Sequence, residues 1–162
     1  MTAPQYQSAR DLFEAAREAS RDAEYIRRRV ERMKASEGVR GASLAPSVSG
    51  TKSDVSGTAR VNARIDYEAA TARRVEEDYA LIDLACAVLY GDDSANGVAM
   101  LAGPRVADLL WHHYLDDEPW DDAAEAVGMS RATAFREAAK AFDIIDSYGL
   151  EFARRGLGMA EG

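Results

Sequence analysis

The residues best suited to chemistry form a short basic stretch that begins at Ser130. The window from Arg131 to Lys140 holds three bases and one acid, with Arg136 as the third base and Glu137 as the acid. Serine is a favoured helix N-cap, because its hydroxyl accepts a hydrogen bond from a free backbone N–H of the first turn. A helix with cations near its N-terminus is suited to contact phosphates and base edges of a duplex. This stretch therefore indicates a DNA-binding helix rather than a catalytic site.

The residues before Ser130 predict a tight turn between two helices. Ala124 is small where the helices would cross closely, and Gly128 follows where the chain must reverse and φ is expected to be positive. Val127 and Met129 flank this glycine and can close a small core. The pattern predicts a helix-turn-helix with helices over residues 105–115, 120–127 and 131–148. The last helix is expected to turn five residues inward: Ala134, Ala138, Ala141, Phe142 and Ile145.

Two long helices are expected to precede this unit. Apolar residues between Ala9 and Met33 recur at alternating steps of three and four, which predicts a helix over residues 6–35. A second apolar stripe predicts another helix over residues 58–91. The two helices could pack as a hairpin within one chain or as an intermolecular coiled coil, and the pattern fits both.

Residues 36–57 separate the two long helices and differ from them in composition. They include six Ser and four Gly and no aromatic residue, which predicts a flexible linker. No stretch alternates between polar and apolar residues, so we expect no sheet. The chain is therefore predicted to be all-α, with two long N-terminal helices, a small helix-turn-helix domain over residues 98–150 and a tail over residues 151–162.

Composition and charge limit the class of protein further. The chain has 28 acids and 20 bases, a formal net charge of −8, so DNA binding needs a local site rather than a basic surface. The excess of acid lies in residues 92–162. Cys86 is the only cysteine, which excludes an internal disulfide and fits a reducing compartment. Residues 1–10 lack an apolar core and the apolar stretch 81–90 is short, so we expect neither a signal peptide nor a membrane span.

The remaining polar groups form no catalytic or metal-binding pattern. His112 and His113 are neighbours and would point about 100° apart on a helix, so one metal ion would not take both. The sequence contains neither a phosphate-binding glycine loop nor the spacing of a nucleophile with its base. We therefore expect no enzyme activity, no metal and no cofactor.

Several of these residues also carry a resemblance to known families. The C-terminal part resembles region 4 of bacterial sigma factors, and more closely the phage-encoded late transcriptional regulators of the ArpU/RinA type. The resemblance rests on Tyr114-Leu115, Trp120–Ala124, Gly128–Arg131 and Phe135-Arg136. Proteins of that type carry a sigma-like helix-turn-helix behind two long helices joined by a Ser/Gly-rich linker. The resemblance implies binding to double-stranded DNA near phage or prophage genes and activation of the host RNA polymerase, in the bacterial cytoplasm at the nucleoid.

Carried over by position, the resemblance also implies which residues contact DNA. The candidate DNA-binding residues are Ser130, Arg131, Ala132, Thr133, Phe135, Arg136 and Lys140. Lys140 is expected nearer the DNA backbone, and Phe135 is the aromatic residue expected to be exposed at the groove. A dimer formed through the long helices would place two recognition helices about 34 Å apart on a two-part site.

A run of acids before the turn leaves other functions open. It comprises Asp116, Asp117, Glu118, Asp121, Asp122 and Glu125. Because acids repel phosphates, either this face points away from DNA or the domain binds DNA only weakly by itself. The face is expected to be a solvated surface or a docking surface for a basic partner such as a polymerase. Two other functions fit the same sequence. One is a phage DNA-packaging adaptor of the small-terminase sort, and the other is a protein-interaction module that does not bind DNA.

Overall fold

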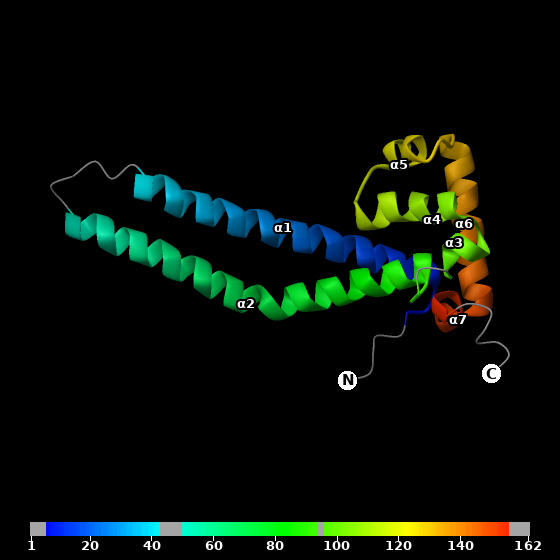
Figure 1. The fold of residues 1–162 in the computed structure, drawn as a ribbon, viewed down its shortest axis with the longest axis horizontal. Coiled ribbons are helices and arrows are strands. Elements are labelled where there is room, and N and C mark those ends of the chain that lie inside the picture. The colour runs from blue at the N-terminus through cyan, green and yellow to red at the C-terminus, as the bar shows by residue number, and fades with distance from the viewer. Residues whose placement is uncertain (1–5, 43–49, 94–95, 156–162) are drawn as a thin grey trace. The chain divides into compact units, whose positions relative to one another are not determined.

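The computed structural model describes residues 6–42, 50–93 and 96–155, and all regular structure in these ranges is helical (Figure 1). The predicted all-α class with two long N-terminal helices is confirmed. Within the described ranges, no helix is both long enough and apolar enough to cross a membrane. The elements in chain order are α1 (Ala9–Ala42), α2 (Gly50–Tyr90), α3 (Val98–Leu101), α4 (Pro104–Leu110), the π-helical turn η1 (Trp111–Leu115), α5 (Trp120–Ala126), α6 (Arg131–Tyr148) and α7 (Leu150–Arg155).

Both long helices extend into the segment that the sequence predicts to be a linker. α1 continues to Ala42 and α2 begins at Gly50, so helix occupies both ends of the range 36–57. Residues 43–49 lie outside the described residues. The predicted flexible linker is therefore wrong at its two ends.

Contacts between the two helices stabilise the positions from which this extension starts. Arg64 of α2 donates to the Glu37 carboxylate of α1 at 2.8 Å, and Arg60 donates to the Ser36 hydroxyl at 2.7 Å. Glycine inside a helix costs only about 1 kcal/mol relative to alanine, a cost that such pairs can offset. A prediction from composition considers each residue by itself and does not include these cross-helix bonds.

The predicted tail is also helical in its first part. α7 follows directly after Gly149, whose φ of +92° ends α6. Ala153 is fully buried, and its N–H donates to the carbonyl oxygen of Gly149 at 3.1 Å. Arg154 pairs with Asp92 at 3.3 Å, so α7 is tied to the segment that follows α2. Residues 156–162 of the predicted tail lie outside the described residues.

The chain divides into two compact units that differ from the predicted domains. Of the described residues, 6–21 and 78–155 belong to the first unit and 22–77 to the second. The sequence pattern predicts that residues 98–150 form a domain by themselves. The structure adds the first turns of α1 and the last turns of α2 to that domain.

The core of the first unit is built around Phe13 of α1. Phe13 is 0% exposed, and its ring centre lies 5.6 Å from those of Tyr114 and Phe142. Leu12 beside it is also fully buried. Cys86 of α2 packs against the same core, and burial raises the pKa of its thiol, as expected for a packing residue. The start of α1 is therefore an integral part of this unit.

In the second unit, α1 and α2 run antiparallel as a hairpin within one chain. Near its base, Arg74 donates to the Asp22 carboxylate at 2.8 Å. The predicted apolar seam of α1 is buried as far as Ile26 and half-buried at Val30 and Met33. Burial of the seam decreases toward Met33, and charged pairs between the helices supplement this apolar contact.

Candidate nucleic-acid interface

The turn between α5 and α6 has the conformation that its sequence predicts. Gly128 has a φ of +69°, a left-handed conformation that glycine adopts without strain. The Met129 N–H donates to the carbonyl oxygen of Ala124 at 2.9 Å. Arg105 of α4 donates from Nε to the carbonyl oxygen of Val127 and from Nη2 to that of Gly128, both at 2.9 Å. These bonds fix the direction in which α6 leaves the turn.

A small buried cluster holds α4, α5 and α6 together below the turn. Its alanines let the helices approach closely, because no larger side chain separates their backbones. Two residues beside Gly128, Val127 and Met129, pack against the cluster as predicted. The buried members are Leu109, Ala123, Ala124 and Ala134.

Ser130 caps the N-terminus of α6, as its type and position predict. Its Oγ accepts from the Thr133 N–H at 3.1 Å and donates to Thr133 Oγ1 at 2.9 Å. Arg136 Nη2 lies 3.5 Å from the same Thr133 oxygen. Three of the candidate DNA-binding residues are thus linked by hydrogen bonds at the start of the helix. The first role of Ser130 and Thr133 is to stabilise this start.

α6 has one buried face and one exposed face. Opposite the core lie Ala132, Arg136, Ala139 and Lys140, all exposed. At 3.6 residues per turn these positions share one side of the helix. The Lys140 side chain is 62% exposed, and its Nζ lies 3.6 Å from Glu137. The buried face consists of the five residues that the sequence predicts to point inward: Ala134, Ala138, Ala141, Phe142 and Ile145.

Arg131 lies on a different side of α6. It stands five positions before Arg136, which places the two side chains about 140° apart around the helix axis. Its guanidinium lies 5.4 Å from the ring centre of Phe135, and its Nε lies 3.5 Å from the Asp121 carboxylate. Its side chain is 64% exposed. Arg131 is therefore accessible at the N-terminal edge of α6 but partly neutralised by α5.

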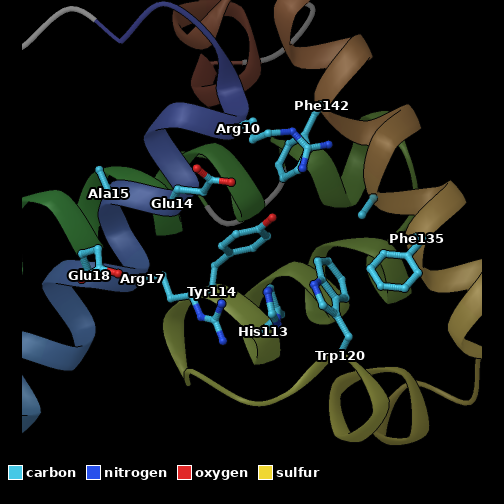
Figure 2. A pocket seen from close by; sticks show the side chains of 11 residues that line it. Arg10, Glu14, Ala15, Arg17, Glu18, His113, Tyr114, Trp120, Phe135 and Phe142 are labelled. Atoms are coloured by element: carbon cyan, nitrogen blue, oxygen red, sulfur yellow. The ribbon is translucent and has the colours of Figure 1, made fainter.

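Phe135 lies apart from the face of Arg136 and Lys140. Its ring centre is 5.1 Å from that of Trp120, and the residue is 42% exposed. Both rings line a pocket of about 480 Å³, and Figure 2 shows them next to each other at one end of it, with Glu18 at the other. The pocket explains why Phe135 is exposed. That it stacks on bases stays a prediction.

This pocket combines an aromatic side with a charged side. Arg10 and Arg17 of α1 line it together with Glu14 and Glu18 of the same helix, so the formal charges balance. The aromatic side is formed by residues of η1, α5 and α6: His113, Tyr114, Trp120, Phe135 and Phe142. A pocket without net charge does not select a charged ligand by sign.

His113 is held on the aromatic side of the pocket in its neutral form. Its ring stacks on Trp120, with centres 3.8 Å apart and planes 20° from parallel. Nδ1 donates to the carbonyl oxygen of Glu118 at 2.8 Å. Burial lowers the pKa of His113, because the charged ring would lose its hydration there. His113 is therefore a structural residue of this unit.

Asp117 ties the loop after η1 to α1. It accepts hydrogen bonds from Arg17 Nε at 2.8 Å and from Arg21 Nε at 2.9 Å. Burial by itself raises the pKa of the Asp117 carboxyl, but the bonds from Arg21 and Arg17 outweigh it and hold that pKa below its ordinary value. No pattern in the sequence predicts a partner for this acid. The only signal is a pair of arginines one turn apart on a helix that the sequence assigns to a separate arm.

The rest of the acidic run divides between the loop and α5. Asp121, Asp122 and Glu125 are exposed on α5 and face solvent. Asp116 lies in the loop, where burial and the neighbouring Glu118 carboxylate raise its pKa. The accessible acids of the run are therefore Asp121, Asp122 and Glu125 on α5, together with Asp116, which is exposed in the loop.

One group of side chains in the described part of the chain has the donors of a metal site. His112, Asp116 and Glu118 bring a ring nitrogen and two carboxylate oxygens within 4.8 Å of one another. An imidazole with two carboxylates could hold a divalent cation. However, His112 Nδ1 already lies 2.5 Å from Glu118 Oε2, and this pair accounts for two of the three donors. His113 faces Trp120 instead, so the two histidines serve different partners, as their spacing predicts.

Comparisons with known proteins give no relative of this chain. No protein-family model matches it, and neither does any curated protein or solved structure. The resemblance to phage late regulators therefore stays an expectation from the residues quoted above. The function has to be argued from the geometry of α5, the turn and α6.

Proposed function

We propose that α5 and α6 form a helix-turn-helix that binds double-stranded DNA, and that the protein regulates transcription through it. The observation that carries the proposal is the exposed face of α6. Arg136 and Lys140 stand on this face, with Ala132 and Ala139 beside them, and the one exposed acid on it, Asp143, comes in the turn after Lys140. Small neutral side chains let a helix enter the major groove closely, while the two cations reach base edges and phosphates.

The N-terminal end of α6 also favours binding to the phosphates of DNA. Its N-terminal N–H groups carry a partial positive charge, and Ser130 leaves the helix end open to solvent. Arg131 at the same end can reach a phosphate if it leaves Asp121. The acids farther along the helix are less favourable. Asp146 accepts from the Ala9 N–H at 2.7 Å and points to α1, whereas Asp143 is exposed. The cationic part of α6 is thus its first half.

The acidic surface of α5 favours a protein partner in the same process. Asp121, Asp122 and Glu125 are exposed there and would repel a phosphate backbone laid along α5. A basic surface of a transcription protein fits these acids better. We therefore propose that DNA contacts α6 while α5 faces a protein, as expected for a regulator that works through RNA polymerase.

Selection of binding sites from a library of random DNA duplexes tests the proposal. The wild-type chain should enrich a defined sequence, and the double variant Arg136→Ala, Lys140→Ala should bind the enriched duplex roughly 10- to 100-fold more weakly. A matched control, Lys34→Ala with Arg73→Ala, removes the same charge from exposed positions of the second unit. Failure to enrich any sequence, or an equal loss in both double variants, would overturn the proposal.

A further inference from the structure

A groove in the second unit is lined by three arginines from two helices. α1 contributes Arg29 and Arg32, and α2 contributes Arg60. The groove has a volume of about 480 Å³, and no carboxylate is among the described residues that line it. Its other lining residues are Met33, Ser36 and Ala63. We call it the arginine groove.

The charges of these arginines are not neutralised by their contacts. The Arg29 guanidinium lies 5.0 Å from the ring centre of Tyr67, and Arg60 Nη1 donates to Ser36 Oγ at 2.7 Å. Both partners are neutral. Arg32 is exposed and makes neither a hydrogen bond nor an ion pair with another described residue. Three positive charges therefore share one groove without a counter-charge from the described residues.

Other arginines of the same unit, unlike these three, form ion pairs with glutamates. Arg27 pairs with Glu24 and Glu31, each at 2.6 Å, and Arg28 pairs with Glu24 at 2.9 Å. Arg64 of α2 contacts Glu37 at 2.8 Å, and Glu31 beside Arg32 pairs with Arg27, so both of these carboxylates already have an arginine partner. In a chain with 28 acids and 20 bases, most arginines find an acid. The three arginines of the groove lie close together without an acid partner among the described residues, an arrangement that calls for an external anion.

We propose that the arginine groove binds phosphate groups of a DNA backbone. Guanidinium groups bind phosphate oxygens bidentately, and the apolar Met33 and Ala63 beside them lower the local dielectric and strengthen the attraction. The Ser36 hydroxyl can donate one more hydrogen bond to a phosphate. The choice of DNA as the source of the phosphates rests on the proposed function, whereas the match to phosphate rests on the groove alone.

The salt dependence of binding to a random-sequence duplex tests this proposal. The variant Arg29→Gln, Arg32→Gln, Arg60→Gln should reduce the slope of log affinity against log salt by about 0.9 for each phosphate that is no longer bound, up to about 2.7. The matched control Arg27→Gln, Arg28→Gln, Arg73→Gln removes the same charge from arginines that pair with glutamates. It should change the slope by less than about 0.9, the value for a single phosphate. Equal slopes in the two triple variants would overturn the proposal.

Two further measurements keep the result unambiguous. Arg32→Gln alone disturbs no described contact, so it should reduce the slope by about 0.9 even if the triple variant does not fold. Inorganic phosphate is the second probe. If millimolar phosphate raises the melting temperature of the wild type but not of the groove variant, while the DNA slopes are equal, the groove takes free phosphate and the DNA proposal fails.

The groove and α6 can fail independently. In one outcome, the double variant at Arg136 and Lys140 keeps the wild-type DNA sequence preference while the groove variant shows a smaller slope of log affinity against log salt. In that case the proposed helix-turn-helix is wrong, and the proposal that the groove binds DNA phosphates is retained. If the double variant loses the sequence preference and the groove variant has the same salt dependence as its control, the groove proposal is wrong and the helix-turn-helix proposal is retained.

Discussion

The ring of Phe13, near the start of α1, packs 5.6 Å from the ring of Tyr114 in η1. This contact joins the first turns of the chain to the unit that carries α5 and α6. It is supported by Arg17 and Arg21, which bind Asp117 in the loop that follows Tyr114. The candidate DNA-binding helix therefore rests on a core that α1 helps to build.

Replacing Phe13 by alanine should destabilise the first unit by about 3–5 kcal/mol, because it removes a fully buried ring and leaves a cavity between Tyr114 and Phe142. Tryptophan fluorescence during urea unfolding measures this, since both tryptophans lie in the first unit. Ile65→Ala is the control, because Ile65 is 51% exposed in the second unit. A loss no larger than that of the control would show that α1 does not belong to this core.

Gly128→Ala should destabilise the first unit by about 1–2 kcal/mol. Alanine is strained at a φ of +69°, and its Cβ would lie 3.1 Å from Arg105 Nη2. Gly57→Ala is the matched control, for which we expect a gain in stability instead of a loss. Gly57 lies inside α2 with nothing within 4 Å of an added Cβ, so alanine should stabilise the helix by about 1 kcal/mol. Thermal unfolding of both variants measures the two effects, and a Gly128→Ala variant as stable as the wild type would contradict the conformation of the turn.

The stability of the first unit should fall as the pH is lowered from 7 to 5.5. The pKa of His113 is lowered by burial, so below a pH of about 6.5 the unfolded chain takes up a proton that the folded chain does not. The resulting slope is at most about 1.4 kcal/mol per pH unit. In His113→Gln this dependence should flatten, even though the loss of the stack on Trp120 lowers stability at every pH. An unchanged slope in the variant would assign the titration to another group.

Asp117→Asn should cost about 1 kcal/mol of stability. Asparagine tolerates the φ of +55° found at this position, so the change removes the charge and keeps the backbone. The ion pairs are partly exposed, which keeps their contribution small and sensitive to salt. Glu18→Gln is the control, because Glu18 contacts the same Arg21 but is 74% exposed. Differential scanning calorimetry should show a smaller loss of stability for Asp117→Asn in 0.5 M salt, where the screening length is about 4 Å. A loss equal to that of Glu18→Gln would contradict the role of Asp117 in tying its loop to α1.

Sequence patterns predicted those features of the fold that depend on residues close together in the sequence. The bounds of α6, the cap at Ser130 and the left-handed glycine at 128 follow from residue types and spacing, and the structure has them as predicted. These features depend on neighbours within one or two helical turns. Backbone sterics and capping act at that range, so one stretch of sequence contains the necessary information.

The parts that the sequence missed depend on distant partners. Nothing near Phe13 shows that its ring meets Tyr114, because the seam pattern accounts for one stripe of α1 and leaves Phe13 outside it. The arginine pair that binds Asp117 is one of several charged pairs on α1. The arginine groove likewise needs Arg60 of α2 to line the same groove as Arg29 and Arg32 of α1, a register that only the packed hairpin defines.

Asp121→Asn should tighten binding to random-sequence DNA roughly fivefold, or about 1 kcal/mol. The carboxylate lies 3.5 Å from Arg131 Nε and holds that guanidinium toward α5. Without its charge, Arg131 can turn to a phosphate, and one repulsive charge near the helix start is removed. Asp66→Asn, at an exposed position of α2, makes the same change in net charge and should alter affinity less. Fluorescence anisotropy at fixed salt measures both variants, and a gain equal to that of Asp66→Asn would mean that Arg131 does not reach DNA and that the interface is confined to the face of Arg136 and Lys140.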